Sequence, residues 1–107
     1  MKLLIQLRTP TEMASYEGCA LALTLATFGH DVQLYLDAPV FGLLMQSDSR
    51  LHGMIQSLEL YDMPAAWLPE DVFSGWVTGM LPTDLASQLT IVPELINSQD
   101  FEQILAF

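Results

Sequence analysis

Basic side chains are scarce in this sequence, which has 3 lysines and arginines against 13 aspartates and glutamates. The formal charge of −10 leaves no basic surface that could neutralise nucleic-acid phosphates, so we expect no direct binding of DNA or RNA. The acidity is typical of a solvated surface that keeps an apolar protein in solution. The alternative interpretation is a docking surface for a basic partner.

Cysteine is nearly absent as well. The single cysteine, Cys19, excludes an internal disulfide and a cysteine-based zinc site, and it fits a reducing cytoplasm. The uncharged run over residues 18–29 is too short to cross a bilayer. The amino-terminal apolar run is interrupted by Arg8 and lacks a small-residue cleavage site, unlike a signal peptide. We therefore predict a cytoplasmic protein without membrane contact.

Glycine is missing from the turn in which a nucleotide-binding protein would need it. The first predicted strand is followed by RTPT (8–11), which offers no phosphate-cradling loop. The two histidines and the cysteine do not have the spacing of a metal site. The sequence therefore predicts no nucleotide, no metal and no other cofactor.

Apolar residues, in contrast, are abundant. They make up 51% of the chain, whereas charged residues make up 15%, below the quarter or so that is typical of soluble domains. A chain of 107 residues forms one domain, so we expect a single domain over 1–107. A domain of this size does not easily hide so much apolar surface, and we predict that part of it faces another chain.

The first third of the chain reads as a strand, a helix and a strand. Residues 2–7 form an apolar run, and 31–37 alternate between apolar and polar side chains. Between them, Thr9, Pro10 and Glu12 have the spacing of a helix start, and Gly29 marks the stop, which predicts a helix over 10–28. This βαβ unit implies a parallel pair of strands with a right-handed crossover.

The remainder continues the alternation of helices and strands. The predicted elements are an amphipathic helix over 49–60, a strand over 65–68, a partly helical loop over 70–82, a strand over 87–92, a short helix over 93–100 and a strand over 102–107. The fold class that follows is α/β, with three layers and a five-stranded, mostly parallel sheet flanked by helices.

The predicted first helix is apolar on two opposite sides. One side can pack on the sheet, and Leu21, Leu25 and Phe28 lie on the side that needs cover from a second protein. Cys19 lies in the middle of the helix, away from its electropositive start and from any Lys or Arg that would stabilise a thiolate. We interpret Cys19 as a small buried residue, with a sulfur-carrying role as the alternative.

Three further side chains are candidates for function. Asp37 ends a predicted parallel strand, where open α/β sheets place their ligands, although an aspartate there is also a common turn former. His30 follows Gly29 and is expected to interact with the last carbonyls of the helix. His52 is expected to be exposed or at an interface. No metal ligand is predicted, and the one candidate for a catalytic residue is Cys19.

Several segments, taken in order, resemble the DsrE/DsrF-like family, and specifically its TusC/DsrF branch. The segments are Glu17-Gly18 entering an apolar helix, DVQLYLD (31–37), VFGLLMQ (40–46), LELYDMPAAWL (58–68) and FEQILAF (101–107). The branch has Asp-Gly after its second strand, where this chain has Ala38-Pro39. Phe41 lies in the segment that does match, and it is a candidate binding or interface residue.

The resemblance implies a subunit of a sulfur-relay complex, built from TusB/DsrH-like, TusC/DsrF-like and TusD/DsrE-like chains. Such complexes pass persulfide sulfur toward 2-thiouridine in transfer RNA or act in sulfur oxidation. The working thiol belongs to the TusD/DsrE-like subunit, in the loop after the third strand. This chain has AAWLPEDVF (65–73) there, without a cysteine. It would therefore be a non-catalytic structural subunit whose partners are TusD/DsrE-like and TusB/DsrH-like chains.

Two alternatives remain open. The chain could be a stand-alone homo-oligomeric module of the same fold that binds a small ligand near Asp37, to which the departure at Ala38-Pro39 gives some support. It could also be a sulfur carrier that uses Cys19. The structural role favours a chain that is not an enzyme by itself but a subunit of a sulfurtransferase complex.

Overall fold

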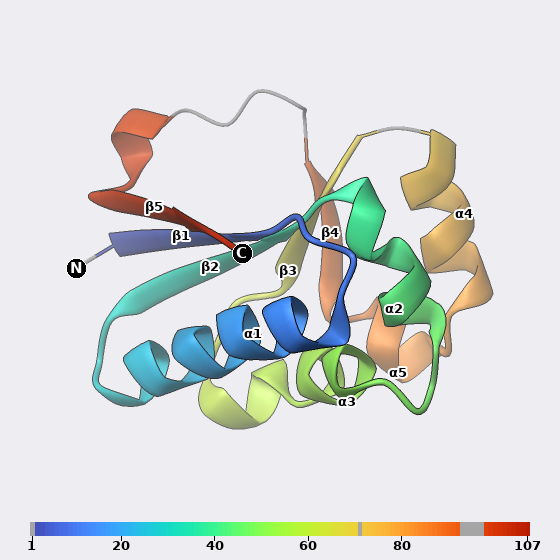
Figure 1. Cartoon of the computed structure of the whole chain (residues 1–107), viewed down its shortest axis with the longest axis horizontal. Helices are drawn as coiled ribbons and strands as arrows, with labels where there is room; N and C mark the ends of the chain where they lie inside the picture. Colours follow the sequence, from blue (N-terminus) through green and yellow to red (C-terminus); the bar gives the residue numbers. More distant parts are fainter. Residues whose placement is uncertain (1, 71, 93–97) are drawn as a thin grey trace.

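The computed structural model describes residues 2–70, 72–92 and 98–107, and its centre is a five-stranded sheet (Figure 1). The strands are β1 (Lys2–Leu7), β2 (Asp31–Leu36), β3 (Ala66–Pro69), β4 (Leu89–Val92) and β5 (Gln103–Ala106). Their order is β4-β3-β2-β1-β5, and all of these pairs are parallel. The α/β class and the five-stranded parallel sheet expected from the sequence are therefore confirmed.

Helices connect the strands. They are α1 (Glu12–Thr27), α2 (Phe41–Met45), α3 (Arg50–Gln56), α4 (Val72–Met80) and α5 (Thr83–Ala86), with the 3₁₀ turns η1 (Ala38–Val40), η2 (Leu58–Tyr61) and η3 (Ser98–Asp100). Strands β1 to β4 follow one another across the sheet in one direction, so right-handed crossovers bring α1, α3 and α5 to the same face (Figure 1). None of the described helices is long and apolar enough to cross a membrane.

The two faces of the sheet bury different clusters. Side chains alternate along a strand, so Leu3, Ile5 and Leu7 of β1 point into the large core between the sheet and the helices. Leu4 faces the other side, in a smaller cluster with Tyr35 and Phe101, and Trp67 packs against this cluster. Phe101 follows η3, and its ring meets the ring of Trp67 edge-on at a centroid distance of 6.1 Å. Among the described residues, this second face thus has the thinner cover.

Helix α1 begins later than the sequence indicates. The expected N-cap was Thr9, but the cap is Thr11, whose hydroxyl accepts a hydrogen bond from the backbone N–H of Ala14 at 3.2 Å. The reason is tertiary: the backbone N–H of Thr9 donates to the carbonyl of Phe107 at 3.0 Å, which ties this part of the chain to the end of β5. The helix ends as expected, with Gly29 at a φ of 89°.

Helix α1 packs closely on the sheet because small residues face it. Its buried positions are Ser15, Gly18, Cys19 and Ala22. A Cβ atom at Gly18 would lie 2.3 Å from Cδ2 of Leu7 and 3.1 Å from Cγ of Phe107, so only glycine fits without a shift. The close approach explains why the helix buries small side chains, while its leucines lie at the margins of the contact.

Two other predicted segments are resolved more finely by the structure. The helix expected over 49–60 is divided into α3 and the 3₁₀ turn η2. The loop expected over 70–82 contains the nine-residue helix α4. Of the helix expected over 93–100, residues 93–97 lie outside the described residues, and 98–100 form η3.

Candidate functional site

The only thiol of the chain lies in the core. Cys19 has no exposed surface, and it belongs to the large core cluster between the sheet and the helices. Burial raises the pKa of the Cys19 thiol from 9.0 to about 12, because an apolar environment disfavours the thiolate. The prediction that Cys19 is a small buried residue is confirmed. Its environment is the opposite of the electropositive, accessible surroundings that make a cysteine reactive.

Asp37 lies at the carboxyl edge of the sheet, directly after β2. Its Oδ2 atom is 3.4 Å from Nε of Arg8, which follows the neighbouring strand β1. Partial burial raises the pKa of Asp37, and the guanidinium of Arg8 opposes this shift. The carboxylate is thus held at the strand ends, but a cation already partners it. Within the described part of the chain, no group of three or more His, Cys, Asp and Glu side chains could hold a metal ion.

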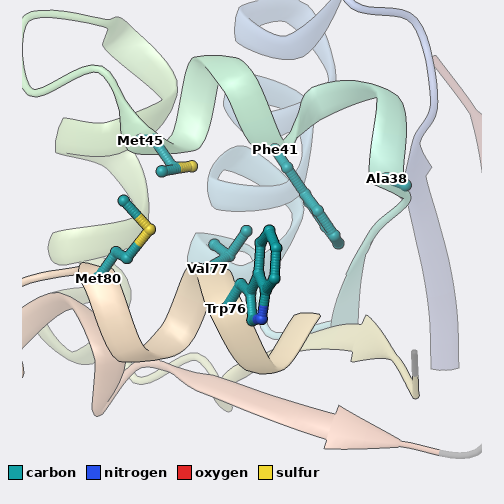
Figure 2. Close-up of a pocket in the computed structure, with 6 residues that line it drawn as sticks. All are labelled: Ala38, Phe41, Met45, Trp76, Val77 and Met80. Atoms are coloured by element: carbon teal, nitrogen blue, oxygen red, sulfur yellow. The ribbon is translucent and has the colours of Figure 1, made fainter. Parts of the chain in front are cut away.

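An apolar groove of about 370 Å³ lies beside Asp37 and between α2 and α4 (Figure 2). Its lining residues are Ala38, Phe41, Met45, Trp76, Val77 and Met80. In Figure 2, Phe41 and Trp76 face one another at one end of the groove, and Met45 and Met80 face one another at the other end. Phe41 and Val77 are buried, whereas Trp76 is 65% exposed and Met80 is 69% exposed. The groove therefore has a packed floor and an open rim.

One wall of the groove, α2, is fixed by the helix that follows it. A helix of five residues leaves its last carbonyls without intrahelical partners. The hydroxyl of Ser49 donates to the carbonyl of Leu43 at 2.6 Å, and Nδ1 of His52 lies 2.8 Å from the carbonyl of Leu44. Because a carbonyl only accepts, Nδ1 of His52 carries the proton of this bond. These two bonds and the burial of Phe41 and Leu44 hold α2 in place.

The other wall, α4, is tied to the end of β3. The hydroxyl of the fully buried Ser74 donates to the carbonyl of Pro69, the last residue of that strand. Further along α4, the hydroxyl of Thr78 donates to the carbonyl of Ser74 at 3.1 Å. Both walls are thus anchored independently of any ligand, and the groove is formed by the fold itself.

The candidate residues indicated by the sequence lie in two different parts of the structure. Phe41 lines the groove, and Asp37 immediately precedes the groove residue Ala38. Leu21 and Leu25 belong to α1, and Phe28 caps its end. Leu21 and Leu25 are half-buried against the core, and Phe28 is 74% exposed at the end of the helix. The candidates therefore do not form a single site. Whether they bind a partner stays a prediction.

His52 is the histidine that the sequence placed wrongly. It was expected to be exposed or at an interface, but it is buried and caps the end of α2. The physical reason is that α2 and α3 are adjacent short helices, so the first turn of one satisfies the last carbonyls of the other. No such pairing can be read from the spacing of residues along α3 alone.

The exposed half of the groove was missed by sequence reasoning. Trp76 and Met80 lie one helical turn apart on α4, with Val77 between them on the buried side. This spacing is the signal that could have identified the helix and its apolar face. Gly75 and Gly79 obscured it, because glycine in a helix interior is unfavourable and favoured the interpretation as a loop.

Comparison with known proteins identifies a solved structure with a similar fold. No family model matches the chain, and no curated protein matches its sequence. Its structure is similar to the crystal structure of the YchN protein from E. coli, with a TM-score of 0.73 and 19% sequence identity, over 100% of this chain and 99% of that chain. YchN has the DsrE/DsrF-like fold. The likeness shows that this chain has the same fold, and the low identity limits the conclusion to the fold.

Proposed function

We propose that this chain is a non-catalytic structural subunit of a heteromeric sulfur-relay complex, as the TusC/DsrF branch of the family is. The observation that carries the proposal is the complete burial of Cys19, the single thiol of a chain with the DsrE/DsrF-like fold. A sulfur-relay protein with this fold and no accessible thiol has to work through its contacts with other subunits.

The chemistry of sulfur transfer supports this assignment. A persulfide is formed and passed on when a thiolate attacks a sulfur atom, so the carrier needs both access and a substantial thiolate fraction. Cys19 has neither, because it is buried and its pKa is raised to about 12. In the family, the carrier cysteine lies in the loop after the third strand. In this chain β3 ends at Pro69 and Glu70 follows it, and neither is a cysteine.

The distribution of apolar surface is consistent with two different neighbours. At the carboxyl edge of the sheet lies the groove between α2 and α4. Away from it, at the end of α1, Phe28 is exposed, and Leu60 and Tyr61 are exposed on η2, a 3₁₀ turn that contacts α1. A chain that meets two different subunits needs two distinct surfaces, whereas a simple two-fold dimer needs one. The proposed neighbours are TusD/DsrE-like and TusB/DsrH-like chains in the cytoplasm.

The test is co-expression of this chain with the DsrE-like and DsrH-like chains of the same organism, followed by native mass spectrometry. The expected result is a complex with a defined ratio of the three chains. A persulfide, generated by a cysteine desulfurase and detected by intact mass, is expected on the DsrE-like chain and not on Cys19.

Other outcomes would contradict the proposal. A stable homotrimer or homohexamer that binds none of these partners would favour a stand-alone module with a ligand near Asp37. A persulfide on Cys19 of the folded chain would instead favour a sulfur carrier. The two results are separable, because the first is read from assembly masses and the second from the mass of the modified chain.

A further inference from the structure

We infer that the groove between α2 and α4 docks an amphipathic helix of a partner protein, one whose apolar side chains are flanked by lysine or arginine. This goes beyond the proposed function, since it concerns the chemistry of the segment that the groove accepts and its test uses no sulfur-relay subunit. The argument rests on the lining of the groove, its shape and the charges around it.

The lining favours a protein segment over a small molecule. Sites for small ligands combine apolar walls with a few polar groups that fix the orientation of the ligand. The six residues that line this groove carry apolar side chains, apart from the indole N–H of Trp76. Met45 and Met80 have flexible, polarisable side chains of the kind that adapt to the apolar anchors of a bound helix.

The shape of the groove fits a helix. Its two walls are themselves helices, and the nine residues of α4 span about 13 Å at 1.5 Å per residue. That length matches roughly two turns of a partner helix, which present apolar side chains at positions i, i+4 and i+7 to one face. Large exposed side chains such as Trp76 and Met80 are the kind that carry most of the binding energy in protein interfaces.

The charges indicate that the partner is basic. From Ala38 to the end of the chain, Arg50 is the only lysine or arginine, and its guanidinium lies over the ring of Tyr16 on α1 at 4.8 Å. Asp37 immediately precedes the groove residue Ala38, and Arg8 already partners its carboxylate at 3.4 Å. The exposed Glu70 lies just before α4. A second copy of this chain also carries a net charge of −10, so two copies repel one another, which disfavours self-association and favours a cationic helix.

The experiment measures binding of a synthetic 18-residue helix of leucine and lysine, with the leucines on one face, by isothermal titration calorimetry. The control peptide has the same composition in an order that spreads the leucines around the helix. We expect micromolar binding of the first peptide at low salt, at least tenfold weaker binding of the second, and about tenfold weakening of the first in 0.5 M salt. In NMR spectra, the indole N–H of Trp76 is expected to shift and that of Trp67 to stay.

A matched pair of variants localises the site. Met80→Lys places a positive charge at the groove, and Met13→Lys makes the same change on α1, where Met13 is 73% exposed. Both positions are exposed, so both variants are expected to fold. Met80→Lys is expected to weaken peptide binding at least tenfold and Met13→Lys less than twofold.

Four results would overturn the inference. They are no binding by the unmodified chain, equal binding of the two peptides, equal effects of the two variants, and a dimer of the chain itself that Met80→Lys dissociates.

Discussion

The burial of Cys19 predicts how slowly its thiol reacts in the folded protein. The reagent is a disulfide such as 5,5′-dithiobis(2-nitrobenzoate), which thiolates attack and whose product absorbs visible light. At pH 8, a thiol with a pKa of about 12 has a thiolate fraction of about 10⁻⁴, whereas one at 9.0 has about 10⁻¹. Ionisation alone therefore predicts labelling about 1000-fold slower than in denaturant, and the lack of exposed surface slows it further.

The same pKa shift predicts how stability depends on pH. The thiol of Cys19 stays neutral in the folded state, whereas in the unfolded state it ionises near pH 9.0. Its contribution to the free energy of unfolding is therefore fully present below pH 9. Between pH 9 and 12 this contribution is lost, at about 1.4 kcal/mol per pH unit, or roughly 4 kcal/mol in all. The measurement is the difference in free energy of unfolding between the protein and Cys19→Ala, which cancels the titration of tyrosines and lysines. Labelling of the native state within tenfold of the unfolded rate, or a pH-independent difference, would refute the reasoning.

Three further predictions concern the parts of the fold that position these groups. Gly18→Ala is expected to lower the free energy of unfolding by about 1–2 kcal/mol, because the clash with buried neighbours outweighs the helix propensity of alanine. The control is Gly53→Ala, where a Cβ atom meets nothing within 4 Å, so this variant is expected to stabilise the protein by up to about 1 kcal/mol. Urea denaturation measures the free energy of unfolding of both variants, and equal effects would contradict the packing argument. In the same assay, Thr11→Ala is expected to lower the free energy of unfolding by about 1 kcal/mol, because it removes the N-cap of α1, and Thr9→Ala by much less. The reverse order would show that Thr9 is the cap, as the sequence indicates. His52→Ala removes buried volume and leaves the carbonyl of Leu44 at the end of α2 without its donor. We expect a loss of about 2–3 kcal/mol in the free energy of unfolding and shifted NMR signals of the groove residues. A loss below about 0.5 kcal/mol would show that the bond does not hold α2 in place.

The architecture was predictable because its signals are local and repeated. The apolar run over 2–7, the alternation over 31–37 and the glycine stop after α1 each specify their element, and their order specifies a parallel sheet. What the sequence could not supply was the tertiary context of the ends of the elements. Thr9 has the local chemistry of a cap, but its backbone is bound to a residue almost a hundred positions away. Helix starts depend on such contacts, and a local motif cannot report them.

The candidate site was less accessible to sequence reasoning. The groove combines α2, a helix of five residues without an independent periodic signal, with α4, whose glycines favoured a loop. Neither helix is strongly specified on its own, and both are held by side-chain bonds to neighbouring elements. The apolar rim arises only when the two helices are brought together at the carboxyl edge of the sheet. Asp37 was placed at that edge correctly, because the end of a parallel strand can be read from the pattern.

The close packing of α1 explains why its thiol is a poor candidate for chemistry. The helix approaches the sheet so closely that Gly18 has no room for a Cβ atom, and the neighbouring buried positions hold serine, cysteine and alanine. A residue at position 19 therefore has to be small and tolerant of an apolar environment, and cysteine meets both conditions without any reactivity. To expose this sulfur, α1 would have to lift from the core that it shares with β1 and β2. The presence of cysteine at this position is therefore accounted for by its small volume and its tolerance of an apolar environment.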